Sequence, residues 1–338
     1  MYKDTILVTP DVYKKIQAPN CINLNNSLSL ENTKESIGYK RGEYNPNNQV
    51  LKEIIGKYHG FNNENVIISS SGICIATIIS VSKQFSKIWY YQKTYPEMKD
   101  AYNSIGNAFE LKSFKDINEN DLVCIETHQI PDCIDNREII AEILQYAHSK
   151  KAFVLIDNSH LSMDYNPFDQ FDVDFVLISL SKHTIGFNNS LVGALICNEK
   201  EKIKEKFVSM REVKSRLGFH IHPLDCYFTL LGIQTLHLRM ERVKQNEESF
   251  SKFLDDNFVS YKLVKNAGVF FIKVNEDFNM NKLYEIKLFN VADTFGVNFS
   301  IFKYWSEFNT IRISLGIENK EDLIEAFKPM IAYIKAHQ

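Results

Sequence analysis

The chain has 338 residues, of which 44% are hydrophobic and 24% are charged. This length exceeds the usual size of a single domain, so we expect two domains. Lysine and arginine number 39 and aspartate and glutamate 42, which gives a net charge of −3 without a long basic run. This balance argues against nucleic acid or an anionic membrane as a partner and indicates a soluble protein that binds a small molecule.

The six cysteines are scattered, with no Cys-x-x-Cys pair and no metal-ligand spacing. We therefore expect no metal site and the reduced thiols of a cytoplasmic protein. Residues 1–10 carry Lys3 and Asp4 and no long apolar core, so a signal peptide is not expected. No apolar stretch approaches the roughly 18 residues that span a bilayer.

Short apolar runs alternate with helix-like segments through the middle of the chain. A polar, Asn-rich arm (residues 1–45) and an amphipathic helix that ends near Gly60 precede them. The runs are 66–68, 88–91, 122–125, 153–156, 175–178 and 191–197. Strands that are apolar on both faces and separated by helices, such as 139–149, predict an α/β domain with a mainly parallel sheet covered on both sides.

The last third of the chain changes in pattern. A helix-rich stretch, 223–254, precedes two apolar runs, 268–274 and 311–314, and a final helix, 322–336, which together predict a smaller α+β domain. The predicted organisation is an arm over 1–45, a large α/β domain over 46–228, and a linker helix with the small domain over 229–338.

A turn of small residues follows the first predicted strand. Ser71, Gly72 and Ile73 begin an apolar helix there, and the free N–H groups and dipole of a helix start suit a phosphate. Ser and Gly also serve as simple helix caps, so the turn alone leaves both interpretations open. The chain has no Gly-x-Gly-x-x-Gly and no Gly-x-x-x-x-Gly-Lys, which disfavours a dinucleotide or a nucleoside triphosphate.

Asp157 stands at the carboxyl end of a predicted buried strand, where open α/β sheets place their ligands. A carboxylate there suits a protonated pyridine nitrogen, a magnesium ion or the cap of the next helix. Ser179 and Ser181 end the next strand on one side, where their hydroxyls can bond a phosphate, and Lys182 follows them. An enclosed lysine beside other cations is partly neutral and able to form an imine, although most lysines at strand ends are simply solvated.

The order of these elements resembles the Cys/Met-metabolism (trans-sulfuration) family of enzymes that use pyridoxal 5′-phosphate (PLP), and Lys182 follows Asp157 by 25 residues. The resemblance covers most of the chain. Two stretches are the most specific. Residues 232–240 match Gly-x-x-Thr-Leu-x-x-Arg-Met, and residues 312–318 match Arg-x-Ser-x-Gly-x-Glu.

The resemblance implies fold type I, the aspartate-aminotransferase-like α/β fold, and a role for each matching residue. Lys182 forms the Schiff base with PLP, Asp157 pairs with the pyridinium, and Tyr91 stacks on the ring. The cofactor-binding residues are Ser71, Gly72, Ile73, Tyr91, Asp157, Ser179, Ser181 and Lys182, with Tyr39 and Arg41 reaching the phosphate of the neighbouring subunit. Arg312 binds the substrate carboxylate together with Ser300. A homodimer or homotetramer with a shared site follows from these roles.

The implied reaction is elimination or replacement at Cβ or Cγ of an amino acid, either sulfur-containing or an activated homoserine. Three departures keep another PLP reaction, transamination or decarboxylation, open. Ile130 stands where the family has an Asn on the ring hydroxyl, and Phe299 stands at a specificity position. Only eleven residues separate Ser300 from Arg312. A non-catalytic scaffold is the remaining alternative.

Overall fold

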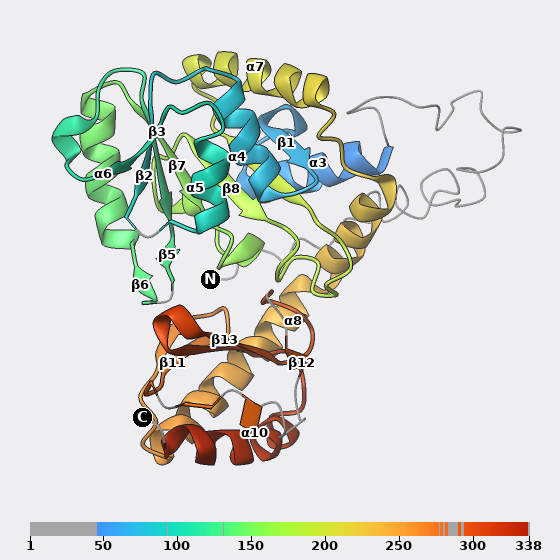
Figure 1. The fold of residues 1–338 in the computed structure, drawn as a ribbon. Coiled ribbons are helices and arrows are strands. Elements are labelled where there is room, and N and C mark those ends of the chain that lie inside the picture. Colours follow the sequence, from blue (N-terminus) through green and yellow to red (C-terminus); the bar gives the residue numbers. More distant parts are fainter. Residues whose placement is uncertain are drawn as a thin grey trace, which may run out of the picture.

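The computed structural model describes residues 46–336, apart from residues 93, 131, 277, 280, 283–289 and 292–293. The predicted arm, with Tyr39 and Arg41, therefore lies outside the described residues. A larger α/β part and a smaller part are joined by the long helix α8 (Pro223–Asp256), which runs from one into the other (Figure 1).

A seven-stranded sheet forms the centre of the larger part, in the order β1-β9-β8-β7-β4-β2-β3. Only β9 is antiparallel to its neighbours, so the predicted mainly parallel sheet is confirmed. The strands are β1 (Val66–Ser69), β2 (Ile88–Tyr91), β3 (Ala108–Leu111), β4 (Leu122–Glu126), β7 (Phe153–Asp157), β8 (Phe175–Ser179) and β9 (Gly193–Cys197). Edge strand β3 was not predicted, because only its two ends are buried.

Helices cover both faces of this sheet, and side chains that alternate along the strands pack against them. One face carries α3 (Pro46–His59), α6 (Arg137–Ser149) and the start of α8, which pack against Val123 and Ile125 among others. The other face carries α4 (Gly72–Val81), α5 (Pro96–Tyr102) and α7 (Glu201–Leu217), which pack against Leu122 and Cys124. Burial on both faces explains the near-continuous apolar strands.

The smaller part pairs a five-stranded sheet with α8 and α10 (Lys320–Lys335). Its order is β10 (Lys262–Val264), β11 (Val269–Lys273), β14 (Thr310–Ser314), β13 (Ile301–Trp305) and β12 (Asn290–Val291), antiparallel except between β12 and β13. Phe250, Phe270 and Phe327 are fully buried in its core. The predicted α+β character is confirmed. The proposed domain boundary at residue 228 falls inside unbroken α8 and stays a prediction.

Short elements complete the described chain. They are the hairpin strands β5 (His128–Gln129) and β6 (Ile134–Asp135) and the 3₁₀ turns η2 (Asn63–Asn65), η3 (Phe114–Asp116), η4 (Ser162–Asp164), η5 (Pro167–Asp169) and η6 (Ser306–Phe308). The hairpin extends from the large sheet toward the smaller part (Figure 1). Within the described residues, none of the helices is both long enough and apolar enough to cross a bilayer.

Candidate active site

Strand direction gathers the predicted residues at one edge of the large sheet. Strands β1, β2, β4, β7 and β8 all run the same way, so their carboxyl ends share this edge. Ser71 follows β1, Tyr91 ends β2, Asp157 ends β7 and Ser179 ends β8. Ligands of open α/β sheets bind in this position.

The turn after β1 is held tightly against β9. The Ser71 hydroxyl caps α4 by accepting a hydrogen bond from the Cys74 N–H at 3.0 Å. A Cβ placed on Gly193 would lie 2.4 Å from the Ser71 carbonyl carbon, so β9 needs glycine where it passes the turn. The first N–H groups of α4 have no acceptor within the helix. Phosphate binding by this turn stays a prediction.

Hydroxyl contacts shape the segment that leads to Lys182. The Ser181 hydroxyl accepts from the Val192 N–H at 2.7 Å and donates to the Val192 carbonyl at 3.2 Å. The Ser179 N–H donates to the Ser159 hydroxyl at 3.0 Å. In these contacts Ser181 ties the loop to the strand that follows it, and its predicted phosphate contact is not tested by them.

Lys182 lies between the two parts of the molecule. Its Nζ donates to the Thr294 hydroxyl at 3.1 Å and lies 4.9 Å from the centre of the Phe295 ring. Burial, and then the charge of Arg312, lower the pKa of Lys182 to about 8. At pH 7 roughly a tenth of such an amine is neutral, far more than for an ordinary lysine. The predicted nucleophile therefore has the required environment.

Helix α8 fixes the backbone just after Lys182. The Arg239 guanidinium donates to the carbonyls of His183 at 2.7 Å and Thr184 at 2.9 Å. It also comes so close to Gly186 that a Cβ there would lie 2.4 Å from Nη1. Gly186 has a φ of +76°, which favours glycine. The Arg of the Arg-Met motif thus positions the lysine loop.

Two carboxyl groups lie side by side at the ends of β4 and β7. Asp157 and Glu126 are cross-strand partners, and both are buried. Burial raises the pKa of each, and the charge of Asp157 raises the pKa of Glu126 further. Glu126 Oε1 accepts from the Tyr95 N–H at 2.7 Å, and Asp157 Oδ1 accepts from the Ser159 N–H at 2.9 Å. Such a pair favours a nearby positive charge or a shared proton.

Several buried polar atoms beside this pair have no hydrogen-bond partner among the described residues. They are Glu126 Oε2, Thr127 Oγ1, His128 Nδ1 and both amide atoms of Gln129. Buried polar groups are normally paired, so orphans gathered at one strand end fit a polar ligand that bonds to them. With Lys182, Asp157 and the α4 turn at the same edge, these residues fit PLP. Ile130, next in the chain, packs against an apolar cluster.

Tyr91 is half-buried at the end of β2, where its hydroxyl accepts from Gln92 at 2.9 Å. Burial raises its pKa, and the bond from Gln92 opposes that rise. The side chain is thus a neutral phenol at ordinary pH. Its predicted stacking on the cofactor ring stays a prediction.

Arg312 and Ser300 are both buried but differ in their contacts. Arg312 Nη2 donates to the Thr294 carbonyl, and the guanidinium lies 5.3 Å from the Trp305 ring centre. The Ser300 hydroxyl donates to Glu318 at 3.0 Å and accepts from the Gly316 N–H at 2.9 Å. Ser300 therefore braces the turn after β14, and its predicted substrate contact is untested.

Sequence reasoning missed three side chains of this site: Thr294, Phe295 and His160. His160 stacks on Phe295 with ring centres 5.1 Å apart and an angle of 5° between planes. Burial, followed by neighbouring positive groups that include Lys182 and Arg312, lowers the pKa of His160 to about 3. The signal for His160 was its place three residues after Asp157. The exposed Phe299 was noted instead of Phe295.

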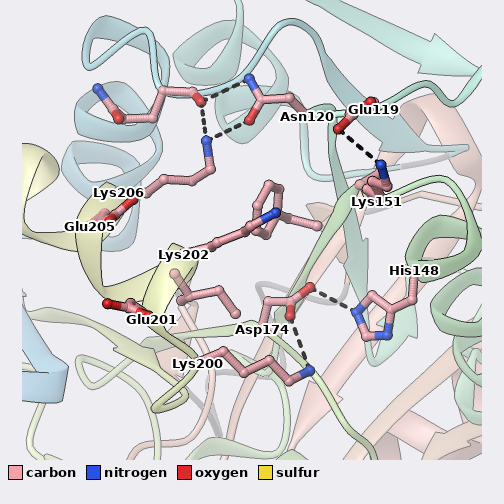
Figure 2. Close-up of a pocket in the computed structure, with 14 residues that line it drawn as sticks. Glu119, Asn120, His148, Lys151, Asp174, Lys200, Glu201, Lys202, Glu205 and Lys206 are labelled. Carbon is pink, nitrogen blue, oxygen red and sulfur yellow. Dashed lines mark hydrogen bonds and ion pairs between the residues drawn. The ribbon is translucent and has the colours of Figure 1, made fainter.

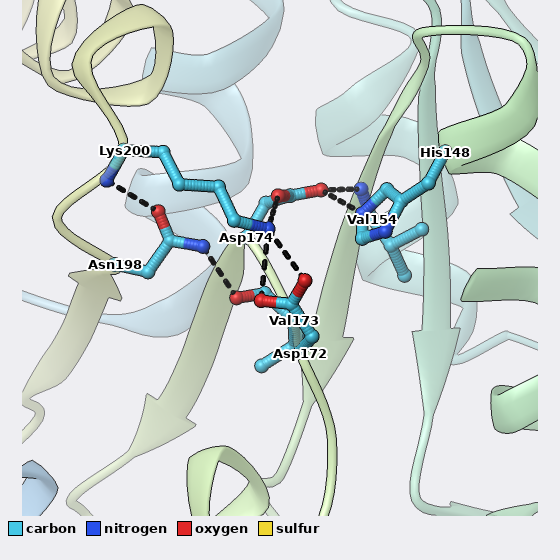
Figure 3. A network of polar contacts seen from close by, with 7 residues as sticks. All are labelled: His148, Val154, Asp172, Val173, Asp174, Asn198 and Lys200. Atoms are coloured by element: carbon cyan, nitrogen blue, oxygen red, sulfur yellow. Dashed lines mark hydrogen bonds and ion pairs between the residues drawn. The ribbon is translucent and has the colours of Figure 1, made fainter. Parts of the chain in front are cut away.

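A cavity of about 550 Å³ lies at the opposite, amino-terminal edge of the sheet. Charged side chains line it, and some of them contact other lining residues: Lys151 pairs with Glu119 at 3.7 Å, and Lys206 donates to the Asn120 amide oxygen at 2.5 Å (Figure 2). In the wall of this cavity, Asp174 accepts from the Val154 N–H at 2.8 Å and contacts His148 and Lys200 (Figure 3). Among the described residues, no group of three or more His, Cys, Asp or Glu is placed to hold a metal ion.

Comparison with known proteins agrees with this arrangement. The chain is 25% identical to cystathionine gamma-lyase of Dictyostelium discoideum, covering 88% of this chain and 89% of the relative. It is 24% identical to cystathionine gamma-synthase of Haemophilus influenzae, covering 84% and 85%.

Solved structures show the same fold. A cystathionine gamma synthase from Xanthomonas oryzae pv. oryzae matches with a TM-score of 0.72 at 18% identity, over 86% of this chain and 87% of that one. A methionine gamma lyase from Micromonospora echinospora matches with a TM-score of 0.73 at 20% identity, over 86% and 87%. The profile of the Cys/Met metabolism PLP-dependent enzymes matches residues 13–271, and this chain belongs to that family.

Proposed function

We propose that this enzyme eliminates or replaces a substituent at Cβ or Cγ of an amino acid that is sulfur-containing or an activated homoserine. One observation carries the proposal. Thr294 binds Lys182 through its hydroxyl and Arg312 through its carbonyl, so a reactive amine and a carboxylate-binding guanidinium share one residue. An α-amino acid carries its amino and carboxylate groups on one carbon, which suits this pair.

Arg312 would hold the substrate carboxylate. Its guanidinium is buried, and Trp305 and Phe295 lie beside it at 5.3 and 5.8 Å from their ring centres. A guanidinium offers parallel donors to both carboxylate oxygens, which orients the substrate as well as binding it. Lys182 would then remove the proton from Cα, because its lowered pKa leaves a useful fraction of neutral amine.

Bound PLP supplies an electron sink for the charge that proton removal leaves at Cα. Asp157 would keep the ring nitrogen positive, since a buried carboxylate without a positive partner is costly. Tyr91, at the same sheet edge, would cover the ring face. The proposed reaction class is supported by relatives named cystathionine gamma-lyase and cystathionine gamma-synthase. These relatives do not favour transamination or decarboxylation.

The test begins with cofactor binding. Purified protein mixed with PLP should turn yellow, and borohydride should fix a pyridoxyl mass on Lys182. A protein that never takes up PLP would refute the proposal. Incubation with cystathionine, methionine, cysteine and O-acylated homoserines, assayed for 2-oxo acid, ammonia and thiol, then separates elimination from replacement. Pyridoxamine phosphate that accumulates without ammonia would instead establish transamination.

We further propose a cytoplasmic homodimer or homotetramer whose subunits share active sites, with the domain division at residue 228. Exposed apolar side chains at the site edge support a covered face: Ile73, Tyr95, Phe187 and Leu191. Mixing inactive Arg41→Ala and Lys182→Ala proteins under subunit exchange should restore part of the activity, because a hybrid contains one intact shared site. Absence of restoration, with exchange verified by mass, would exclude sharing through Arg41.

A further inference from the structure

We propose that Phe295 is a positioning residue whose ring holds both the Lys182 amine and the Arg312 guanidinium in place. The inference rests on the proposed function, because it concerns the two groups that would meet the substrate. It assigns a role to an aromatic side chain that the sequence motifs did not single out.

The Phe295 ring lies within contact distance of both cationic groups. Lys182 Nζ lies 4.9 Å from the ring centre, and Arg312 Cζ lies 5.8 Å from it. Both distances fall within the roughly 6 Å over which a ring attracts a cation. Lys182 comes from the loop after β8 and Arg312 from β14, so one side chain joins groups from the two parts of the molecule.

Neighbouring contacts hold the ring in one orientation. His160 stacks on it at 5.1 Å with nearly parallel planes, and His183 lies 5.9 Å away at 59°. The next residue, Gly296, has a φ of +70° and donates its N–H to the Ser314 hydroxyl at 3.1 Å. A Cβ on Gly296 would lie 2.6 Å from the backbone nitrogen of His183. The backbone beside Phe295 is thus packed directly against the lysine loop.

Charge explains why a ring is useful here. Four titratable groups act on Lys182 or share its ring: Arg312, Glu97, His160 and His183. Arg312 disfavours the Lys182 ammonium and Glu97 favours it, while burial keeps both histidines neutral. The Phe295 face therefore attracts both cations without the full charge of a carboxylate, which would compete with the substrate for Arg312.

A purely structural role makes a different prediction. If Phe295 only fills space between the two parts, its replacement lowers thermal stability and leaves the titration of Lys182 unchanged. If the ring attracts the ammonium, its loss lowers the pKa of Lys182 further. The pH profile of PLP uptake separates these roles, because only the neutral amine attacks the cofactor.

The experiment compares Phe295→Leu, Phe295→Tyr and Phe109→Leu with the wild type. Phe109→Leu is the matched control, since it removes an exposed ring on edge strand β3, to which no role in the site is assigned. Cofactor-free protein is mixed with PLP at a series of pH values, and uptake is followed by visible absorbance. For the wild type we expect a midpoint near the Lys182 pKa of about 8. Phe295→Leu should lower this midpoint by about 0.5 to 1 pH unit, while Phe295→Tyr and Phe109→Leu should not.

Binding of L-alanine, which has no leaving group, tests the second contact. Its dissociation constant for the PLP-loaded protein should rise about threefold to tenfold in Phe295→Leu, and Phe295→Tyr should restore it. An unchanged midpoint and unchanged alanine binding in folded Phe295→Leu would overturn the inference. A wild type that takes up no PLP would instead refute the proposed function. The two failures are therefore distinguishable.

Discussion

Buried carboxyl groups at the two edges of the large sheet differ in how completely the protein satisfies their hydrogen bonds. At the amino edge, Asp121 accepts three hydrogen bonds. They come from the Trp89 ring N–H at 2.8 Å, the Asn118 backbone N–H at 2.9 Å and the Lys87 backbone N–H at 3.1 Å. At the carboxyl edge, Glu126 has one bonded oxygen and one buried oxygen without a partner among the described residues. Acids that stabilise the fold have their bonds completed by the protein, whereas acids of the site leave bonds for a ligand.

Replacement of Asp157 should give the largest effect and show the contrast most sharply. Asp157→Asn keeps the size of the side chain but removes the charge opposite the ring nitrogen. We expect turnover to fall on the order of a hundredfold. Thermal unfolding of the cofactor-free variant should occur at the wild-type temperature or above it, because a costly buried carboxylate is lost. A marked loss of stability without loss of turnover would contradict the assignment.

Replacement of Asp174 should lower stability and leave cofactor binding unchanged. Asp174→Asn weakens contacts to the Val154 N–H and to the side chains of His148 and Lys200. The free energy of unfolding, from urea denaturation, should fall by about 2 kcal/mol. PLP uptake at a temperature where the variant stays folded should match the wild type. Impaired uptake there would mean that the amino edge also serves the site.

The pair of buried carboxyl groups, Glu126 and Asp157, should have a smaller effect, which appears in how the free energy of unfolding depends on pH. Burial raises the pKa of Glu126 and Asp157 in the folded state, so their protonated forms favour folding and stability is lost as pH rises above the ordinary carboxyl range. Glu126→Gln keeps an acceptor for the Tyr95 N–H and removes the ionisation. Between about pH 5 and about pH 8, the cofactor-free variant should lose about 1 kcal/mol less stability than the wild type. Parallel pH curves from urea denaturation would exclude this account.

The sequence predicted the sheet better than it predicted the site. Strands buried along their whole length, such as β4 and β9, produce continuous apolar runs, whereas β3 and β13 have mixed burial and were missed. The order of Asp157 and Lys182 followed from strand ends, which are visible in a linear pattern. Thr294 and Phe295 were not visible, because their partner Lys182 lies more than a hundred residues earlier.

The attention given to Ser300 illustrates the same limit. This sequence keeps the serine that the family pattern has at this position, and the resemblance implied that it binds the substrate carboxylate together with Arg312. In the structure its hydroxyl is used by Glu318 and Gly316, a choice set by how the turn after β14 folds back. The sequence therefore did not reveal these two hydrogen-bond partners, which could come only from coordinates, and the substrate contact of Ser300 stays a prediction.

The reach of Arg239 has a mechanical consequence. Arg239 belongs to α8, the helix that continues into the smaller part. Its guanidinium donates hydrogen bonds to the carbonyls of His183 and Thr184, the two residues that follow Lys182. Any swing of the smaller part that carries α8 with it would pull on that loop. A change in the relative position of the two parts would thus be transmitted through the Arg239 side chain to the lysine loop. The position of Lys182 Nζ would then depend on the position of the smaller part.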